Sequence, residues 1–347
     1  MEFYEVLERY YLVRAEHQTA GELAEQLLSL ARQQGDSALL LEAHRALGQS
    51  LCWRGQVAEA REHLEQAIAL YDPQQHRAHA FRYGRDPGAD CRAYAAWVLW
   101  WLGYPDQGQQ RLQEVLPLAQ ALSHPFSLAM AMVESAIAHL MRREADATQA
   151  RAEAAIAISA EQGFPLWLAF GPVLRGWALA VQGQDEEGIE QLRQGLAAWR
   201  AIGNEFIRPW ILAMLAEAYA LSGQTEAGLA AVAEALATVE ATGERFWEAE
   251  LHRLRGELLL RHAVGAGFKP APTEEAEACF QQALDIARRQ GAKTYELRAA
   301  VSLSRLWQQQ DKREAARQLL AEIYGWFTEG FDTTDLKEAR ALLDTLS

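Results

Sequence analysis

The stretch WILAMLAEAYALSG, from Trp210 to Gly223, is followed directly by QTEAGLAAVAEALATVEATG, which ends at Gly243. Apolar residues recur in both parts at intervals of three and four, which is the period of a helix with one buried face. Glycine ends each part, as is typical just beyond a helix C-terminus. No alternating run of β-branched residues suggests a strand. The segment therefore predicts two helices joined by a short turn.

This helical pair recurs along the chain with a period of 40 residues, which is marked by small residues. The first helix of successive pairs carries Ala96, Ala136, Gly176, Ala216 and Gly256. A second small-residue series lies 12 positions further on and includes Gly108, Thr148, Gly188 and Gly228. Because a small side chain lets a neighbouring helix approach closely, the two series predict a stack of helical pairs.

The residues around these positions resemble the tetratricopeptide repeat (TPR). That repeat has a large residue, Leu-Gly and Tyr on its first helix, and Ala, Phe and Ala on its second, over 34 residues. Met214, Leu215, Ala216 and Tyr219 match the first helix, and Gly228, Val232 and Ala235 match the second. The resemblance implies an all-α, TPR-like solenoid wound into a right-handed superhelix. It would have about eight helical pairs of period 40 and a C-terminal capping helix.

The period predicts a single superhelical domain over residues 1–347. Its parts would be an N-terminal pair over 1–38, seven further pairs over 39–331, and a capping helix over 332–347, with insertions near 72–88 and 263–273. The second insertion is rich in Gly and Pro and indicates an exposed loop. The first contains His76, His79, Phe81 and Tyr83, which are secondary binding candidates if the segment is more than a passive linker.

Composition excludes several classes of function. The chain has 47 Asp and Glu against 33 Lys and Arg, a net charge of −14, and no basic stripe, so we expect no nucleic-acid or membrane partner. No window of 18 apolar residues free of charge occurs, and the acidic N-terminus is unlike a signal peptide. Cys52, Cys91 and Cys279 lie far apart, which indicates buried free thiols in a cytoplasmic protein.

The sequence contains no motif for catalysis. It has no phosphate-binding Gly-rich loop ending in Lys-Ser or Lys-Thr, and no dinucleotide fingerprint after a strand. The pair His76 and His79 lacks nearby third and fourth ligands, so we expect no metal and no cofactor. We therefore predict a non-enzymatic protein; an active site assembled from residues distant in sequence is the remaining alternative.

In a TPR superhelix the first helices line the concave face, and here the middle of that face is apolar. The binding candidates are Trp97, Trp100, Trp101, Met130, Met141, Phe170, Trp177 and Trp210. An exposed groove of this kind would hold an apolar partner segment, or a sugar or aromatic ligand on its tryptophans. The alternative is that the superhelix coils tightly and these side chains form a core.

The C-terminal end of the same face is charged. It carries Glu250, Arg253, Glu257, Arg261, Arg298 and Arg305. These residues predict either a solvated ladder of ion pairs or a polar contact site.

Longer stretches resemble the C-terminal repeat region of bacterial multidomain signalling proteins that combine an AAA/STAND-type ATPase with an adenylate/guanylate cyclase or winged-helix domain. They are 71–88, 102–107, 175–179, 253–260 and 324–331; maltose-regulator activators are looser relatives. The resemblance implies a sensor or scaffold that binds a protein or peptide segment. A small-molecule sensor is the alternative. The chain lacks the upstream catalytic motifs, so no ATPase or cyclase activity is expected of it.

Overall fold

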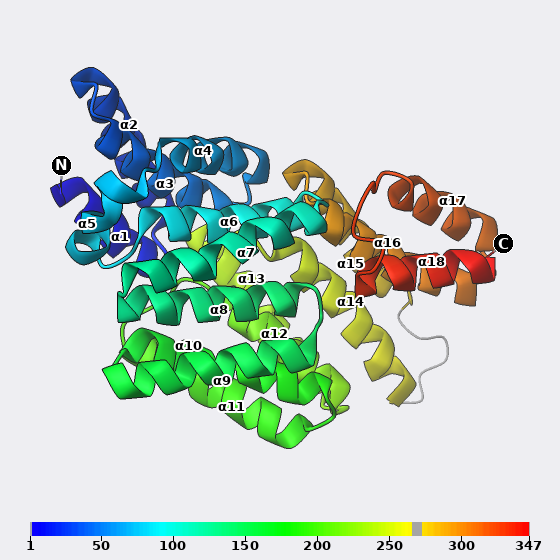
Figure 1. The fold of residues 1–347 in the computed structure, drawn as a ribbon. Helices are drawn as coiled ribbons and strands as arrows, with labels where there is room; N and C mark the ends of the chain where they lie inside the picture. The colour runs from blue at the N-terminus through cyan, green and yellow to red at the C-terminus, as the bar shows by residue number, and fades with distance from the viewer. Residues whose placement is uncertain (1, 266–272, 347) are drawn as a thin grey trace.

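The computed structural model describes residues 2–265 and 273–346, in which it has eighteen α-helices and no β-strand (Figure 1). The eight helical pairs are α1 (Glu2–Val13) and α2 (His17–Gln34), α3 (Ser37–Trp53) and α4 (Val57–Leu70), α6 (Pro87–Trp101) and α7 (Pro105–Leu122), α8 (Pro125–Met141) and α9 (Ala145–Gln162), α10 (Pro165–Val181) and α11 (Asp185–Ala201), α12 (Arg208–Leu221) and α13 (Thr225–Thr242), α14 (Glu248–Gly265) and α15 (Thr273–Gln290), and α16 (Lys293–Gln309) and α17 (Arg313–Tyr324). The helix α5 (Pro73–Tyr83) lies between the second and third pairs, and α18 (Thr334–Leu346) follows the last. The predicted all-α, TPR-like solenoid with a C-terminal helix is confirmed.

The small-residue series lies where the two helices of a pair cross. A Cβ atom on Gly188 of α11 would lie 2.6 Å from the carbonyl oxygen of Gly176 on α10. In the pair α6 and α7, a Cβ on Gly108 would lie 2.8 Å from the carbonyl oxygen of Ala96. Both distances are shorter than any real Cβ contact, so the pairs pack this closely because these positions carry no side chain.

In six of the eight pairs, the turn uses a left-handed residue seven positions after the small residue of the first helix. Gly183 and Gly223 occupy it with φ of 85° and 76°. Glycine suits this conformation because it has no Cβ to clash with the backbone. In the pair α8 and α9 the same position is Arg143, at φ 61°. In the pair α16 and α17 it is Asp311, at φ 62°.

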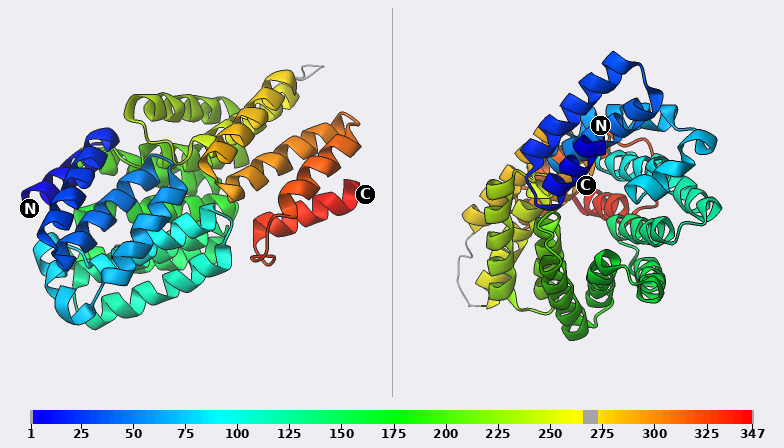
Figure 2. Two further views of the ribbon diagram at one scale, coloured as in Figure 1. Left: turned by 90° about the horizontal axis from the view of Figure 1, so that it is seen from above. Right: turned by 90° about the vertical axis from the view of Figure 1, so that its left-hand side faces the viewer.

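The solenoid closes on itself, so that pairs four and five apart along the chain come into contact. The indole nitrogen of Trp101 on α6 donates to the hydroxyl of Tyr295 on α16, 3.1 Å away. The backbone nitrogen of Arg245 donates to the carbonyl of Trp53 at 3.0 Å, and the Nη2 atom of Arg298 donates to the carbonyl of Met141 at 3.1 Å. Figure 2 shows the resulting ring of helices in its right-hand view, with α18 near the axis.

The two insertions differ in outcome. The first contains α5, whose N-terminus is capped by the Asp72 carboxylate, which accepts from the backbone nitrogen of Gln74 at 2.8 Å. The second, predicted as an exposed loop, falls largely on residues 266–272, which lie outside the described residues.

The three cysteines are free and buried, as predicted. None of the described helices combines the length and the apolarity needed to cross a membrane.

Candidate functional site

The eight apolar groove candidates form core rather than an open groove. Each is at most 5% exposed; they are Trp97, Trp100, Trp101, Met130, Met141, Phe170, Trp177 and Trp210. Their rings pack on one another, with centroids 6.3 Å apart for Trp97 and Trp210 and 5.6 Å apart for Phe170 and Trp210. The exposed apolar groove is therefore corrected to a self-filled interior, the second of the two alternatives that the sequence allowed.

The chain's own later segment covers this interior. Phe246 and Trp247 precede α14, and both are buried. The Trp247 ring stacks on Trp210, with centroids 5.2 Å apart and planes at 10°, and the Phe246 ring packs edge-on against Trp101. Because the superhelix returns on itself here, these two rings lie where a partner segment was expected.

Of the secondary candidates, His79 connects α5 to α3, whereas His76 and Tyr83 contact residues of the insertion itself. His76 is buried, and its Nδ1 atom accepts from the backbone nitrogen of Asp72 at 2.9 Å. The Nδ1 atom of His79 lies 2.7 Å from Oε1 of Glu42 on α3. The Tyr83 ring packs edge-on against His79 with centroids 5.2 Å apart.

Phe81 points elsewhere. It is 64% exposed, and its ring lies against His124, with centroids 5.0 Å apart. The four candidates of the first insertion therefore do not converge on one point. No group of three or more His, Cys, Asp or Glu side chains within 2–265 and 273–346 is placed to hold a metal ion.

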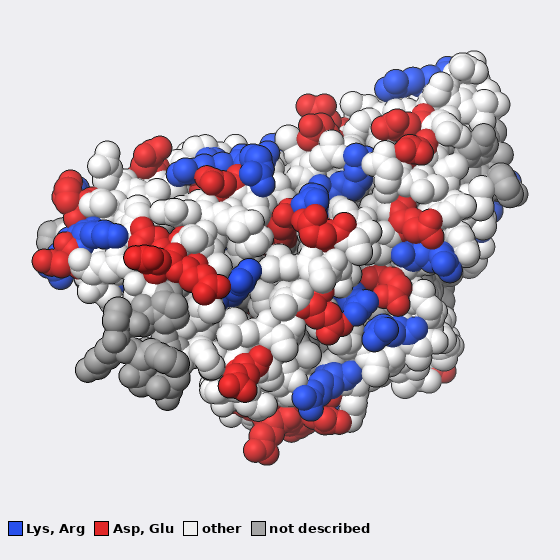
Figure 3. All heavy atoms as spheres, turned by 180° about the vertical axis from the view of Figure 1, so that it is seen from behind, with Lys and Arg blue, Asp and Glu red and all other residues white. Residues whose placement is uncertain are grey.

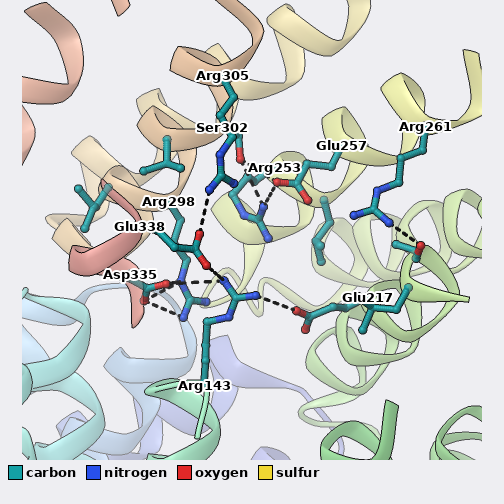
Figure 4. Close-up of a pocket in the computed structure, with 15 residues that line it drawn as sticks. Arg143, Glu217, Arg253, Glu257, Arg261, Arg298, Ser302, Arg305, Asp335 and Glu338 are labelled. Atoms are coloured by element: carbon teal, nitrogen blue, oxygen red, sulfur yellow. Dashed lines mark hydrogen bonds and ion pairs between the residues drawn. The ribbon is translucent and has the colours of Figure 1, made fainter. Parts of the chain in front are cut away.

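The charged end of the concave face forms a polar cavity of about 200 Å³, which we call the arginine pocket (Figure 4). It lies where α12, α14 and the end of α8 meet α16 and α18. We call the earlier helices the first superhelical turn, and α16 to α18, which return over them, the second. Its charged and hydroxyl side chains are Arg143, Glu217, Arg253, Glu257, Arg261, Arg298, Ser302, Arg305, Asp335 and Glu338. Five guanidinium groups thus face four carboxylates.

The floor of the arginine pocket is a set of buried ion pairs. Arg298 lies 2.9 Å from the Asp335 carboxylate, and its guanidinium stacks 5.0 Å from the centre of the Trp100 ring. Arg253 lies 2.7 Å from Glu250 and 2.5 Å from Glu257. These charges are paired and hydrogen-bonded, as buried charges must be, and they fix the positions of α14, α16 and α18 relative to one another.

The pKa of Glu250 is lowered by the positive charges around it. Burial raises the pKa of a carboxyl group, but the guanidiniums of Arg253, Arg298 and Arg143 outweigh it and hold the pKa of Glu250 at about 2. The carboxylate therefore stays ionised at any physiological pH.

Arg143 joins the two turns of the superhelix. Its guanidinium lies 3.9 Å from Glu217 on α12, 3.6 Å from Glu338 on α18 and 4.0 Å from Asp335 (Figure 4). Its left-handed backbone is disfavoured for a residue with a side chain by about 1 kcal/mol or more. A strained residue whose side chain enters a cavity is a recurring feature of functional sites.

Arg261 and Arg305 carry the accessible charge of the pocket. Arg261 donates through Nη1 to the carbonyl oxygen of Ala220 at 2.5 Å, and among the described residues no carboxylate lies within 4 Å of it. Arg305 is 48% exposed and lies 3.1 Å from Glu338. Within the described residues, the pocket therefore offers one guanidinium without a counter-charge, Arg261, and one in an exposed, weak pair, Arg305.

Five of the six charged residues that the sequence placed on one face line the pocket, namely Arg253, Glu257, Arg261, Arg298 and Arg305. The sixth, Glu250, pairs with Arg253 below them. The pocket also contains Arg143, Glu217, Asp335 and Glu338. An arginine at a turn position that is glycine in sister repeats was a usable signal. Asp335 and Glu338 gave none, because no local pattern relates the capping helix to the residues of α8, α12 and α14. On the outer face seen in Figure 3, both signs of charge are interspersed.

The comparisons agree with this architecture. No family model matches the chain. An uncharacterised protein of Rhizobium meliloti (strain 1021) is 24% identical over 254 residues, which cover 73% of this chain and 24% of that protein. The chain thus spans about a quarter of the length of this curated relative.

Two solved structures show the fold. A Rap protein in complex with competence and sporulation factor has a TM-score of 0.61 and 12% identity, over 83% of this chain and 74% of its own. Aspartyl phosphate phosphatase F from Bacillus subtilis has a TM-score of 0.53 and 12% identity, over 87% and 74%. The chain has a TPR-like fold.

Proposed function

We propose that this chain is a non-enzymatic interaction module that binds an acidic segment of a partner protein in the arginine pocket. The observation that carries the proposal is the guanidinium of Arg261, which lines a 200 Å³ cavity and has no carboxylate within 4 Å among the described residues. A carboxylate or a backbone carbonyl of an extended peptide would complete its hydrogen bonding.

The position of the pocket suits a sensor. Arg143 belongs to the first superhelical turn, whereas Arg305 and Glu338 belong to the second. A ligand that competes for these side chains would change the contacts that hold the two turns together. We propose that such a change is transmitted to other domains of a signalling protein of the ATPase or cyclase type. Support comes from the relative, which is about four times as long as the region it shares with this chain.

A sugar ligand is less well supported. Stacking on a sugar requires an accessible aromatic face, and the groove tryptophans are at most 5% exposed. The apolar partner segment expected in the middle of the groove meets the same objection, since Phe246 and Trp247 fill that space.

The test is selection of binding peptides from a random displayed library on the full chain, followed by affinity measurement by fluorescence anisotropy. We expect acidic peptides whose Kd weakens at least tenfold in the double variant Arg261→Ala/Arg305→Ala and at high salt, because both the charge and its screening matter. Arg317→Ala is the matched control, since Arg317 is 45% exposed and lies on α17, outside the pocket. Selected peptides that are not acidic, or that bind the double variant as well as the wild type, would refute the proposal.

A further inference from the structure

A second cavity, of about 50 Å³, lies inside the first superhelical turn, apart from the arginine pocket. Eight aromatic side chains line it, among them Trp53, Trp97, Trp167 and Trp210. Its two charged or ionisable non-aromatic residues are Glu134 on α8 and Arg85, which precedes α6. We call this space the aromatic cavity.

Glu134 is a buried acid that forms no ion pair within 2–265 and 273–346. It is 5% exposed, and its Oε2 atom has no hydrogen-bond partner among the described residues. Burial raises the pKa of Glu134 well above its ordinary value, and the charge of Asp90 adds to this. Arg85 opposes the rise only weakly, because its Nη1 atom already lies 3.0 and 3.2 Å from the two Asp90 carboxylate oxygens.

The interior around Glu134 is short of positive charge. Asp90 engages both neighbouring guanidiniums, since Arg45 lies 3.5 Å from it as well. Glu8 on α1 is a second buried carboxyl, with neither oxygen hydrogen-bonded within the described chain. An unpaired buried carboxylate is costly, which is why the raised pKa favours the protonated acid. A cation beside Glu134 would stabilise its ionised form.

The walls of the aromatic cavity suit a cation that also has apolar surface. The rings of Trp53 and Trp97 are 6.1 Å apart at 74°, and those of Trp97 and Trp210 are 6.3 Å apart at 68°. Edge-to-face clusters of this kind present the negative faces of some rings to the space between them, and an alkylammonium group binds to such faces. A cavity needs about 10–15 Å³ to hold one water-sized group. The 50 Å³ of the aromatic cavity therefore accepts about four heavy atoms.

We infer that the aromatic cavity binds a small alkylammonium group, up to about the size of trimethylammonium, with Glu134 as the counter-ion and the tryptophan faces as the walls. The indole N–H groups of Trp53, Trp97, Trp167 and Trp210 also lack acceptors in the described chain. They would suit an anion, but an anion would add negative charge beside Glu134 and Asp90. This site is independent of the peptide site in the arginine pocket.

The experiment is titration of the full chain with trimethylammonium chloride, followed by tryptophan fluorescence and by the shift of the melting temperature, at constant ionic strength. A ligand that binds the native state raises its stability, so we expect a saturable change in both signals. Sodium acetate and 2-propanol, each with four heavy atoms, are the anionic and neutral comparisons. We expect trimethylammonium to bind at least tenfold more tightly than either.

The variant Glu134→Gln keeps the shape of the side chain and removes its charge, and we expect it to weaken trimethylammonium binding at least tenfold. Glu25→Gln is the control, because Glu25 is an exposed carboxyl on α2 that does not line the cavity, and it should bind within twofold of the wild type. If Glu134→Gln fails to fold, Trp167→Phe replaces it, with an expected loss of threefold or more. The inference is overturned if the wild type shows no saturable response, if acetate or 2-propanol binds as tightly, or if the folded cavity variant binds like the wild type.

Discussion

Replacing Glu8 by Gln should stabilise the N-terminal helix, and the gain should depend on pH. Glu8 is 0% exposed, and burial raises its pKa from 4.5 to about 7, with Arg45 and Arg85 opposing the rise and Asp90 and Glu42 adding to it. A tenfold change in proton affinity corresponds to about 1.4 kcal/mol. Holding the Glu8 carboxylate ionised in the folded state therefore costs up to about 3 kcal/mol.

The sign follows from the two pKa values. In the unfolded chain Glu8 loses its proton near pH 4.5, and in the folded chain near pH 7, so its contribution to stability is greatest below pH 4.5 and is lost as the pH rises to 7. The Gln variant has no such loss. We expect it to exceed the wild type by about 1 kcal/mol at pH 5 and by about 3 kcal/mol at pH 8.

The measurement is the free energy of opening of α1, obtained from amide hydrogen exchange and corrected for intrinsic rates at each pH. A local measurement is needed because solenoids can open from their ends. Glu25→Gln is the control, since Glu25 is exposed on α2. Equal opening free energies for the wild type and Glu8→Gln at pH 8, or a gain of the same size at pH 5 and pH 8, would refute the reasoning.

Three further changes test the packing and the closure. Gly188→Ala should lower the unfolding free energy by about 1–3 kcal/mol, because the added Cβ would lie 2.6 Å from a backbone atom. Gly21→Ala is the control and should be nearly neutral, because its Cβ would meet a serine hydroxyl at 3.0 Å. Equal melting temperatures for the two variants would contradict this prediction. Glu250→Gln should lower the unfolding free energy by about 3 kcal/mol at pH 7. Because the pKa of Glu250 is about 2, this difference from the wild type should shrink as the pH falls from 4.5 to 2. Urea unfolding across that range measures the difference, and a constant value would count against the prediction. Tyr295→Phe leaves the indole N–H of Trp101 without its acceptor and should cost about 1–3 kcal/mol by thermal unfolding; an unchanged melting temperature would show that this bond does not hold the two turns together.

The arginine pocket shows which part of a site a repeat sequence can predict. Arg253 and Arg261 lie eight positions apart on one helix, so the helical period alone places them on the same face. Arg143 and Asp335 are nearly two hundred residues apart, and nothing in their local sequence relates them. They meet because α18 returns to the end of α8, which depends on every intervening pair.

The sequence by itself determined the helices, their pairing and the positions of close approach, because helical periodicity, glycine at the turns and small residues at the crossings are properties of neighbouring residues. Only the tertiary structure decided that Trp97 and Trp210 are core and that the functional candidates lie elsewhere. The rotation between one pair and the next is a small angle set by side-chain packing, and its sum over five pairs fixes whether the inner wall stays open or closes. A pattern that repeats every 40 residues specifies each step of this rotation only loosely, and the accumulated angle emerges when the whole chain has packed.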